Sequence, residues 1–182
     1  MTIEQDQRDQ LLALARQAVE SAVHRQPLPQ LAELAGVLAE QRGCFVTLTN
    51  AGQLRGCIGT FSPDRPLGHM ILAMGQAAAR DPRFTTDPIT PAELASLTVE
   101  VSVLSPLEPT DQPRDLQVGT HGIYIVSPRG AGCFLPEVAT DMGWNAEEFL
   151  SYCCQSKAGL PADAWQHPAT KVYLFTSEKF GP

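Results

Sequence analysis

The chain has 182 residues and 43% hydrophobic residues, which is enough for a folded domain with its own core. Its formal net charge is −7, and only three lysines accompany ten arginines. Because bulk nucleic-acid binding and anionic membrane surfaces need a basic face, this charge argues against both partners. The N-terminal stretch is polar without a secretory apolar segment, and no stretch is long enough to span a membrane, so we expect a cytoplasmic protein.

Cysteines and histidines are spread along the chain without the spacing of a metal site. No C-x-x-C pair occurs, and an odd number of cysteines does not fit a disulfide framework. The three-cysteine cluster of an iron–sulfur centre is missing, as are the glycine-rich phosphate loops and the common zinc and serine-nucleophile motifs. The sequence therefore predicts no bound metal and no cofactor. The five cysteines are Cys44, Cys57, Cys133, Cys153 and Cys154.

Hydrophobic residues recur at helical spacing in some segments and alternate in others, which predicts helices and strands respectively. The predicted helices span residues 8–25, 31–38, 67–78, 136–143 and 145–159, with a short helix after the capping box at 90–93. The predicted strands span residues 44–49, 54–60, 98–104, 123–126, 132–135 and 170–176, and residues 106–118 are predicted to form a loop. Because these elements do not alternate regularly, an α+β fold is expected.

Residues 54–60 read LRGCIGT and form the second strand of a predicted β-hairpin. Strand alternation places Arg55, Cys57 and Gly59 on one face and the other motif residues on the opposite face. The guanidinium then lies roughly 6–7 Å from the thiol along the strand, near enough to favour the thiolate. Gly56 and Gly59 leave room for a ligand or another backbone. The same residues also fit a small buried cysteine in a glycine-containing strand, and both interpretations stay open.

A carboxylate and an imidazole occupy other predicted strands. Glu100 lies on the polar face of strand 98–104, where a covered carboxylate would need a partner, and Arg55 is the obvious candidate. His121 lies at the mouth of the strand that follows it, where it can act as a general base near pH 7 or simply hydrogen-bond a turn.

Asp81 and Arg83 flank Pro82, which disfavours helix at the preceding residue. The two charged residues are therefore expected on a bend rather than inside an element. They can contribute to a binding site, or they can form an ion pair that fixes the loop.

The LRGCIGT motif resembles the signature of the AMMECR domain family, also called AmmeMemoRadiSam system protein A. Further segments agree in the same order, at residues 81–84, 100–106, 121–122, 135–138 and 157–161. Glu137 stands where the family usually carries Gln. The resemblance covers nearly the whole chain and implies a mainly antiparallel sheet flanked by helices, with a smaller subdomain packed beside the main one. We therefore expect residues 1–182 to be a single AMMECR-like domain.

Two hypotheses of function follow. In the first, the chain is a thiol-dependent enzyme or substrate-handling component, with Cys57 as nucleophile or covalent carrier and His121 as general base. The thiol and the imidazole would then approach within about 8 Å in a cleft between the subdomains. Glu100 would help to shape this catalytic site. The predicted substrate-binding residues are Arg55, Gly56, Gly59, Asp81 and Arg83.

In the second hypothesis the chain is a non-catalytic binding or adaptor domain, and the LRGCIGT hairpin is structural or docks a partner. In the first hypothesis the expected partners are a Memo-like protein and a radical SAM protein, because the family name associates such domains with them, and the chain would process, hold or deliver their substrate. Neither the residues nor the resemblance decides whether the chain is an enzyme.

Overall fold

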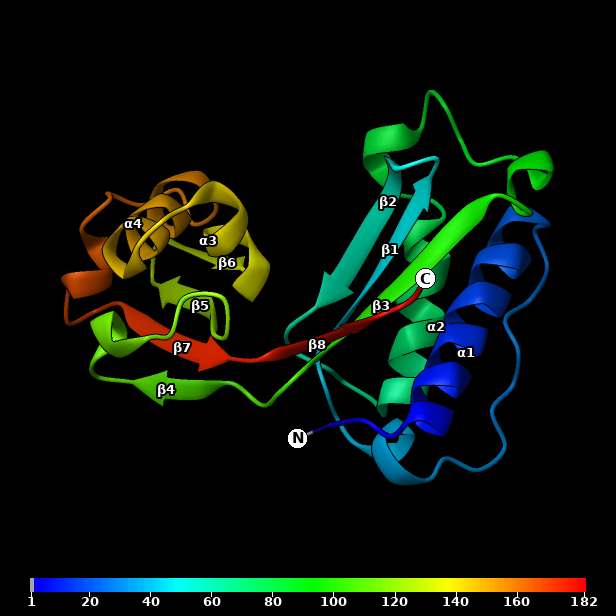
Figure 1. Ribbon diagram of the computed structural model, residues 1–182, viewed down its shortest axis with the longest axis horizontal. Coiled ribbons are helices and arrows are strands. Elements are labelled where there is room, and N and C mark those ends of the chain that lie inside the picture. The colour runs from blue at the N-terminus through cyan, green and yellow to red at the C-terminus, as the bar shows by residue number, and fades with distance from the viewer. Residues whose placement is uncertain (1) are drawn as a thin grey trace. The chain divides into compact units, whose positions relative to one another are not determined.

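The computed structural model describes residues 2–182, which form four α-helices and two four-stranded antiparallel sheets (Figure 1). The predicted α+β fold is confirmed. The chain divides into two compact units, one formed by the residues up to Leu104 together with Glu178–Pro182, the other by Ser105–Ser177. Within residues 2–182, none of the helices combines the length and the hydropathy that a membrane span requires.

The first unit is built on a sheet with the strand order β2-β1-β3-β8. Its strands are β1 (Cys44–Asn50), β2 (Gln53–Thr60), β3 (Leu97–Leu104) and β8 (Ser177–Phe180). Two helices, α1 (Gln5–Val23) and α2 (Leu67–Ala78), pack against each other and against one face of this sheet (Figure 1).

Alternation along the strands explains which sheet face the helices cover. Val46 and Leu48 of β1 and Val101 of β3 are fully or nearly fully buried, and they join Leu11 and Ile71 of the two helices in one hydrophobic core. The residues between them point to the opposite face, here called the helix-free face. Burying the apolar side chains at about 25 cal/mol per Å² is the main force that holds the helices on the sheet.

The second unit is built on a sheet with the strand order β4-β7-β5-β6. Its strands are β4 (Glu108–Thr110), β5 (Gly122–Ser127), β6 (Gly130–Phe134) and β7 (Lys171–Phe175), and its helices are α3 (Pro136–Met142) and α4 (Ala146–Ser156). As predicted, α4 begins with a capping box, in which Asn145 and Glu148 each accept the other's backbone N–H. Gly143 ends the preceding helix in the left-handed conformation.

Three predicted elements differ from the structure. Helix 31–38 is wrong, because only a 3₁₀ turn at Gly36–Ala39 forms and Gly36 has a φ of 56° that a helix does not accept. The predicted loop 106–118 contains the short strand β4, whose Pro109 obscures the strand pattern. Strand 170–176 is not the last strand, since β8 follows it with only Thr176 between them.

Candidate functional site

The β1–β2 hairpin places the Cys57 thiol on the helix-free face. Cys57 lies opposite Thr47, while the neighbouring pairs involve the buried Val46 and Leu48 of the helix-covered face. The Sγ atom is 3.2 Å from Oγ1 of Thr47. The side chain of Cys57 is partly exposed. The motif cysteine is therefore neither a core residue of the sheet nor fully open to solvent.

The glycines of the motif admit close neighbours on both faces. A Cβ atom on Gly56 would lie 2.1 Å from the carbonyl oxygen of Ala78, at the end of α2. A Cβ atom on Gly59 would lie 2.2 Å from the Phe45 ring, which fills that space from the neighbouring strand. Because real Cβ contacts are not this short, both positions require glycine for packing.

An ion pair holds the backbone of Cys57 at the outer edge of β2. The N–H of Cys57 donates to Oδ2 of Asp81 over 3.0 Å, and its carbonyl oxygen accepts from Nη2 of Arg83 over 3.2 Å. Asp81 and Arg83 are themselves paired over 2.6 Å. We call this arrangement the Asp81–Arg83 clamp. It satisfies two polar groups that an edge strand would otherwise leave unpaired, and it fixes the position of the Cys57 peptide.

Within the clamp, the Asp81 carboxylate is buried and strongly stabilised as an anion. The side chain of Asp81 is 1% exposed, whereas that of Arg83 is 57% exposed. The Arg83 guanidinium, with the backbone N–H groups of Cys57 and Arg83, holds the pKa of Asp81 well below its usual range, although burial opposes this. The Asp81 carboxylate in turn raises the pKa of Arg83. Asp81 is therefore a permanent anion at neutral pH.

Comparison with known proteins shows the family of this chain. The family model described as AMMECR1 matches residues 12–180. The chain belongs to the AMMECR1 family. A protein of Methanothermobacter thermautotrophicus is 41% identical over 98% of this chain and 95% of its own length. Protein TK0174 of Thermococcus kodakarensis is 44% identical over 93% of this chain and 87% of its own length.

A solved structure shows the same fold. The crystal structure of uncharacterized protein PH0010 from Pyrococcus horikoshii matches with a TM-score of 0.86 and 36% identity, covering 98% of this chain and 93% of that one. The family resemblance inferred from the motifs is thus confirmed. The names of these relatives state no reaction, so the chain's own residues are what indicates its chemistry.

The predicted pairing of Arg55 with Glu100 is wrong. Arg55 donates instead to Glu93 (Nε to Oε1, 3.0 Å) and to Asp87 (Nη1 to Oδ2, 2.7 Å), and its side chain is only 11% exposed. The Glu93 carboxylate raises the pKa of Arg55. Glu93 also accepts from the side chain of Asn50, so one carboxylate ties the hairpin turn to the 3₁₀ turn at Pro91–Glu93.

A β-bulge explains why strand alternation failed at Arg55. Leu48 pairs with Gly56 and Thr49 pairs with Leu54, so Arg55 is an extra residue in β2. The bulge ends the strict alternation on which the shared face of Arg55 and Cys57 depended. It also puts Leu54, which is 40% exposed, opposite Thr49 of the helix-free face. A role for Arg55 in substrate binding stays a prediction.

Glu100 lies on the helix-free face, as predicted, but with a different partner. Thr47 pairs with Cys57 on one side and with Glu100 on the other, so the three residues form one row across β2, β1 and β3. The Oε1 atom of Glu100 lies 3.1 Å from Nζ of Lys179 on β8. The row therefore carries a thiol, a hydroxyl, a carboxylate and an ammonium group in the order of the four strands.

Sequence reasoning missed Thr47 and Lys179 in this row. The turn at Ala51 and Gly52 alone would set Thr47 opposite Gly56, and the bulge at Arg55 shifts the register by one residue so that Thr47 lies opposite Cys57. No signal in the sequence revealed Lys179, since β8 was not predicted. Among the described residues, no group of three His, Cys, Asp or Glu side chains is arranged to hold a metal ion.

His121 belongs to the second unit, at the start of β5. Its Nδ1 atom accepts the backbone N–H of Gln117 over 3.0 Å, which leaves Nε2 to carry the proton of the neutral ring. Because His121 and Cys57 lie in different units, their approach to within about 8 Å stays a prediction. A role as general base would require the Gln117 N–H to release Nδ1, because Nδ1 is the ring nitrogen that can take up a proton.

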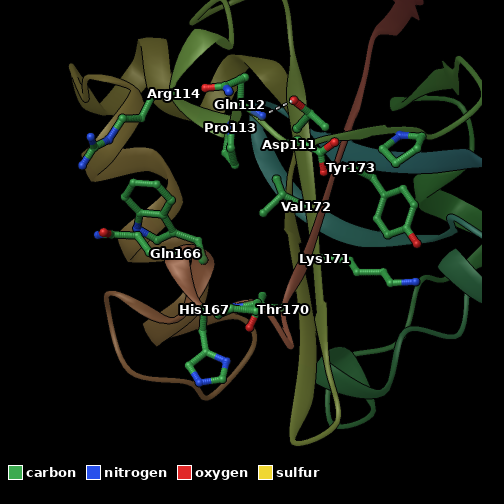
Figure 2. Close-up of a pocket in the computed structure, with 14 residues that line it drawn as sticks. Asp111, Gln112, Pro113, Arg114, Gln166, His167, Thr170, Lys171, Val172 and Tyr173 are labelled. Carbon is green, nitrogen blue, oxygen red and sulfur yellow. Dashed lines mark hydrogen bonds between the residues drawn. The ribbon is translucent and has the colours of Figure 1, made fainter.

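The second unit also contains a pocket of about 680 Å³, which none of the predicted site residues lines. Pro113, Val172 of strand β7 and the segment around Gln166 and His167 line this pocket (Figure 2). The charged ends of Arg114 and Lys171 point away from each other in Figure 2, so they do not converge on one ligand. Arg114 is also bound to Glu147.

The hydroxyl of Thr47 gives a direct test of the thiol environment. We expect Thr47→Val to slow alkylation of Cys57 by iodoacetamide about fivefold at pH 7.5. The reason is that a hydrogen bond from the hydroxyl to the sulfur stabilises the thiolate relative to the thiol by about 1 kcal/mol. Thr47→Ser keeps the hydroxyl and should label at the wild-type rate. The measurement is the labelling rate of the Cys57 peptide by mass spectrometry. Equal rates for Thr47→Val and wild type would contradict a role for the hydroxyl.

Proposed function

We propose that this AMMECR1-family protein is a thiol-dependent enzyme or substrate-handling component in which Cys57 is the nucleophile or covalent carrier. The observation that carries the proposal is the Asp81–Arg83 clamp. It fixes both polar groups of the Cys57 peptide with a buried carboxylate, yet it leaves the thiol itself partly exposed beside Thr47. Immobilising the backbone of a residue whose reactive atom stays accessible is what nucleophilic catalysis requires.

The residues divide the chemistry as follows. The Cys57 thiol loses its proton to a base, and the sulfur then forms a bond to an electrophilic carbon of the substrate. The bond from that carbon to its leaving group breaks, and the leaving group departs with the bonding pair and takes the proton back from the base. His121 is the proposed base, and Thr47 stabilises the thiolate by a hydrogen bond. Glu100 contributes a negative charge to the same row, about two strand spacings from Cys57. The chain's own residues supply these roles without a cofactor.

The proposed partners are a Memo-like protein and a radical SAM protein, from the association in the family name. A component of such a system would hold or pass on a substrate that another protein makes or modifies. The support is the family membership together with the accessible thiol. A co-purification of the three proteins, with a Cys57→Ser variant as control for covalent carriage, tests this part.

Selective labelling of Cys57 tests the proposed thiol chemistry. Cys57 should react with iodoacetamide at least about tenfold faster than any other cysteine, because only the thiolate reacts. Burial raises the pKa of Cys44 to about 12 and that of Cys133 to about 11, and it also raises the pKa of Cys153 and Cys154. Peptide mass spectrometry after partial labelling gives the five rates. Equal, slow labelling of all five cysteines would exclude a functional thiol.

A second candidate function is a non-catalytic adaptor. The observation in its favour is that three motif residues already have structural roles. Arg55 bonds to Glu93 and Asp87. Gly56 lets α2 approach, and Gly59 makes room for the Phe45 ring. Cys57→Ser separates the two candidates, because an adaptor should keep its partner binding when a single sulfur becomes oxygen. A thiol enzyme should lose its activity in the same variant while its melting temperature changes little.

A further inference from the structure

A carboxylate and an ammonium group lie next to each other on the helix-free face. The Nζ atom of Lys179 is 3.1 Å from Oε1 of Glu100, and the side chains are 47% and 23% exposed respectively. Their strands, β8 and β3, are neighbours in the sheet (Figure 1). Since neither side chain is withdrawn from solvent, a ligand on this face would meet both charges.

The charged pair shares its row with the proposed nucleophile. Thr47 of β1 pairs with Cys57 of β2 on one side and with Glu100 of β3 on the other. Neighbouring strands are about 4.8 Å apart, so the carboxylate and the thiol project from positions roughly 10 Å apart on one face. The distance from the Glu100–Lys179 pair to the thiol is therefore one that a short ligand spans.

We infer that the Glu100–Lys179 pair recognises a zwitterion of the amino-acid type, with the ammonium group on Glu100 and the carboxylate on Lys179. A simple anion at this place meets the attraction of Lys179 and the repulsion of Glu100, and a simple cation meets the reverse. A ligand that carries both charges a few ångströms apart pairs each of them with its opposite. Charge complementarity thus selects the zwitterion over either single charge.

The zwitterion is the substrate class of the thiol site only if the proposed thiol function holds. The binding test does not depend on that function. The ammonium and carboxylate groups would fix one end of the substrate, and its side chain or the next residue of a short peptide would carry the electrophilic atom toward Cys57. Binding of the charged end is measurable whether or not the thiol reacts. The two proposals therefore fail separately.

The test is a titration of the full chain with three probes that share a six-carbon chain: norleucine, hexanoate and hexylamine. Backbone amide shifts in β3 and β8 report binding by NMR. Norleucine should bind at least about tenfold more tightly than either single-charge probe, since each ionic contact contributes about a factor of ten. Glu100→Gln and Lys179→Gln should each weaken norleucine binding by a similar factor.

One control completes the experiment. Arg65→Gln removes an exposed ion pair with Asp64 elsewhere in the first unit and should leave norleucine binding unchanged. Hexanoate or hexylamine binding as tightly as norleucine would overturn the inference. So would the absence of any shift in β3 and β8, which would mean that the pair is only a surface ion pair.

Discussion

Gly56→Ala is expected to destabilise the first unit by more than about 4 kcal/mol, a larger loss than most single substitutions cause. The added Cβ would lie 2.1 Å from the Ala78 carbonyl oxygen and 3.0 Å from its carbonyl carbon. These are backbone atoms, so no side-chain rotation relieves the overlap, and either α2 or β2 has to move. The measurement is thermal unfolding followed by circular dichroism.

The same substitution should also disturb the thiol. Asp81 follows Ala78 by three residues, and its Cβ would lie 3.5 Å from the new Cβ on Gly56. Displacing the end of α2 therefore displaces the Asp81–Arg83 clamp, and with it the backbone of Cys57. In whatever fraction stays folded, we expect the rate of Cys57 alkylation to change.

Gly52→Ala is the matched control for Gly56→Ala. Gly52 has a φ of 78° in the hairpin turn, but a Cβ there would meet no atom within 4 Å. It should cost only about 1–2 kcal/mol, from the left-handed backbone alone. Equal melting temperatures for the two variants would show that close packing of α2 is not the reason for glycine at position 56.

The sequence predicted the elements that carry a strong local pattern. The hairpin, strand β3 and helix α2 were confirmed because their alternating or helical apolar positions extend over seven or more residues. The capping boxes at Thr90 and Asn145 were confirmed for a similar reason, since the capping residues are close together in sequence. Local patterns thus determined most of the fold.

The candidate site was only partly predictable, because its partners are distant in sequence. Arg55 was the candidate partner of Glu100 on the assumption of strict alternation, whereas Arg55 lies at a bulge and bonds to Asp87 and Glu93. Lys179 belongs to a strand of four residues near the end of the chain, which is too short for a clear period. Pairing energy between strands, not the local sequence, places these side chains.

The Asp81–Arg83 pair shows how one local motif can support two interpretations. The residues were predicted on a bend, and the structure places them there, as a 3₁₀ turn with Asp81 at its N-cap. The ion pair does fix the loop, but it does so by holding the Cys57 peptide. A structural contact and the positioning of a functional group are here the same hydrogen bonds.

Arg83→Met is therefore expected to destabilise the first unit by about 3 kcal/mol, although Arg83 is more than half exposed. The substitution leaves the Asp81 carboxylate, which is 1% exposed, without its cation, and an unpaired buried charge is costly. Asp81→Asn removes that charge and should cost only about 1–2 kcal/mol, because the amide oxygen still accepts the Cys57 N–H. The double variant should be more stable than Arg83→Met alone.

The pH dependence of the unfolding free energy tests whether Arg83 acts through the Asp81 carboxylate. Because the folded pKa of Asp81 is lowered from the ordinary value of 3.8, the clamp contributes its full stability above that value and loses it as the pH falls through the lower, folded pKa. The gap in unfolding free energy between wild type and Arg83→Met should thus be widest at neutral pH and shrink below about pH 4. Denaturant melts at pH 7, 5 and 3 measure this gap, with Arg65→Met as the exposed-pair control, expected within about 0.5 kcal/mol of wild type. A gap that stays constant with pH would mean that Arg83 stabilises the fold through packing rather than through the Asp81 carboxylate.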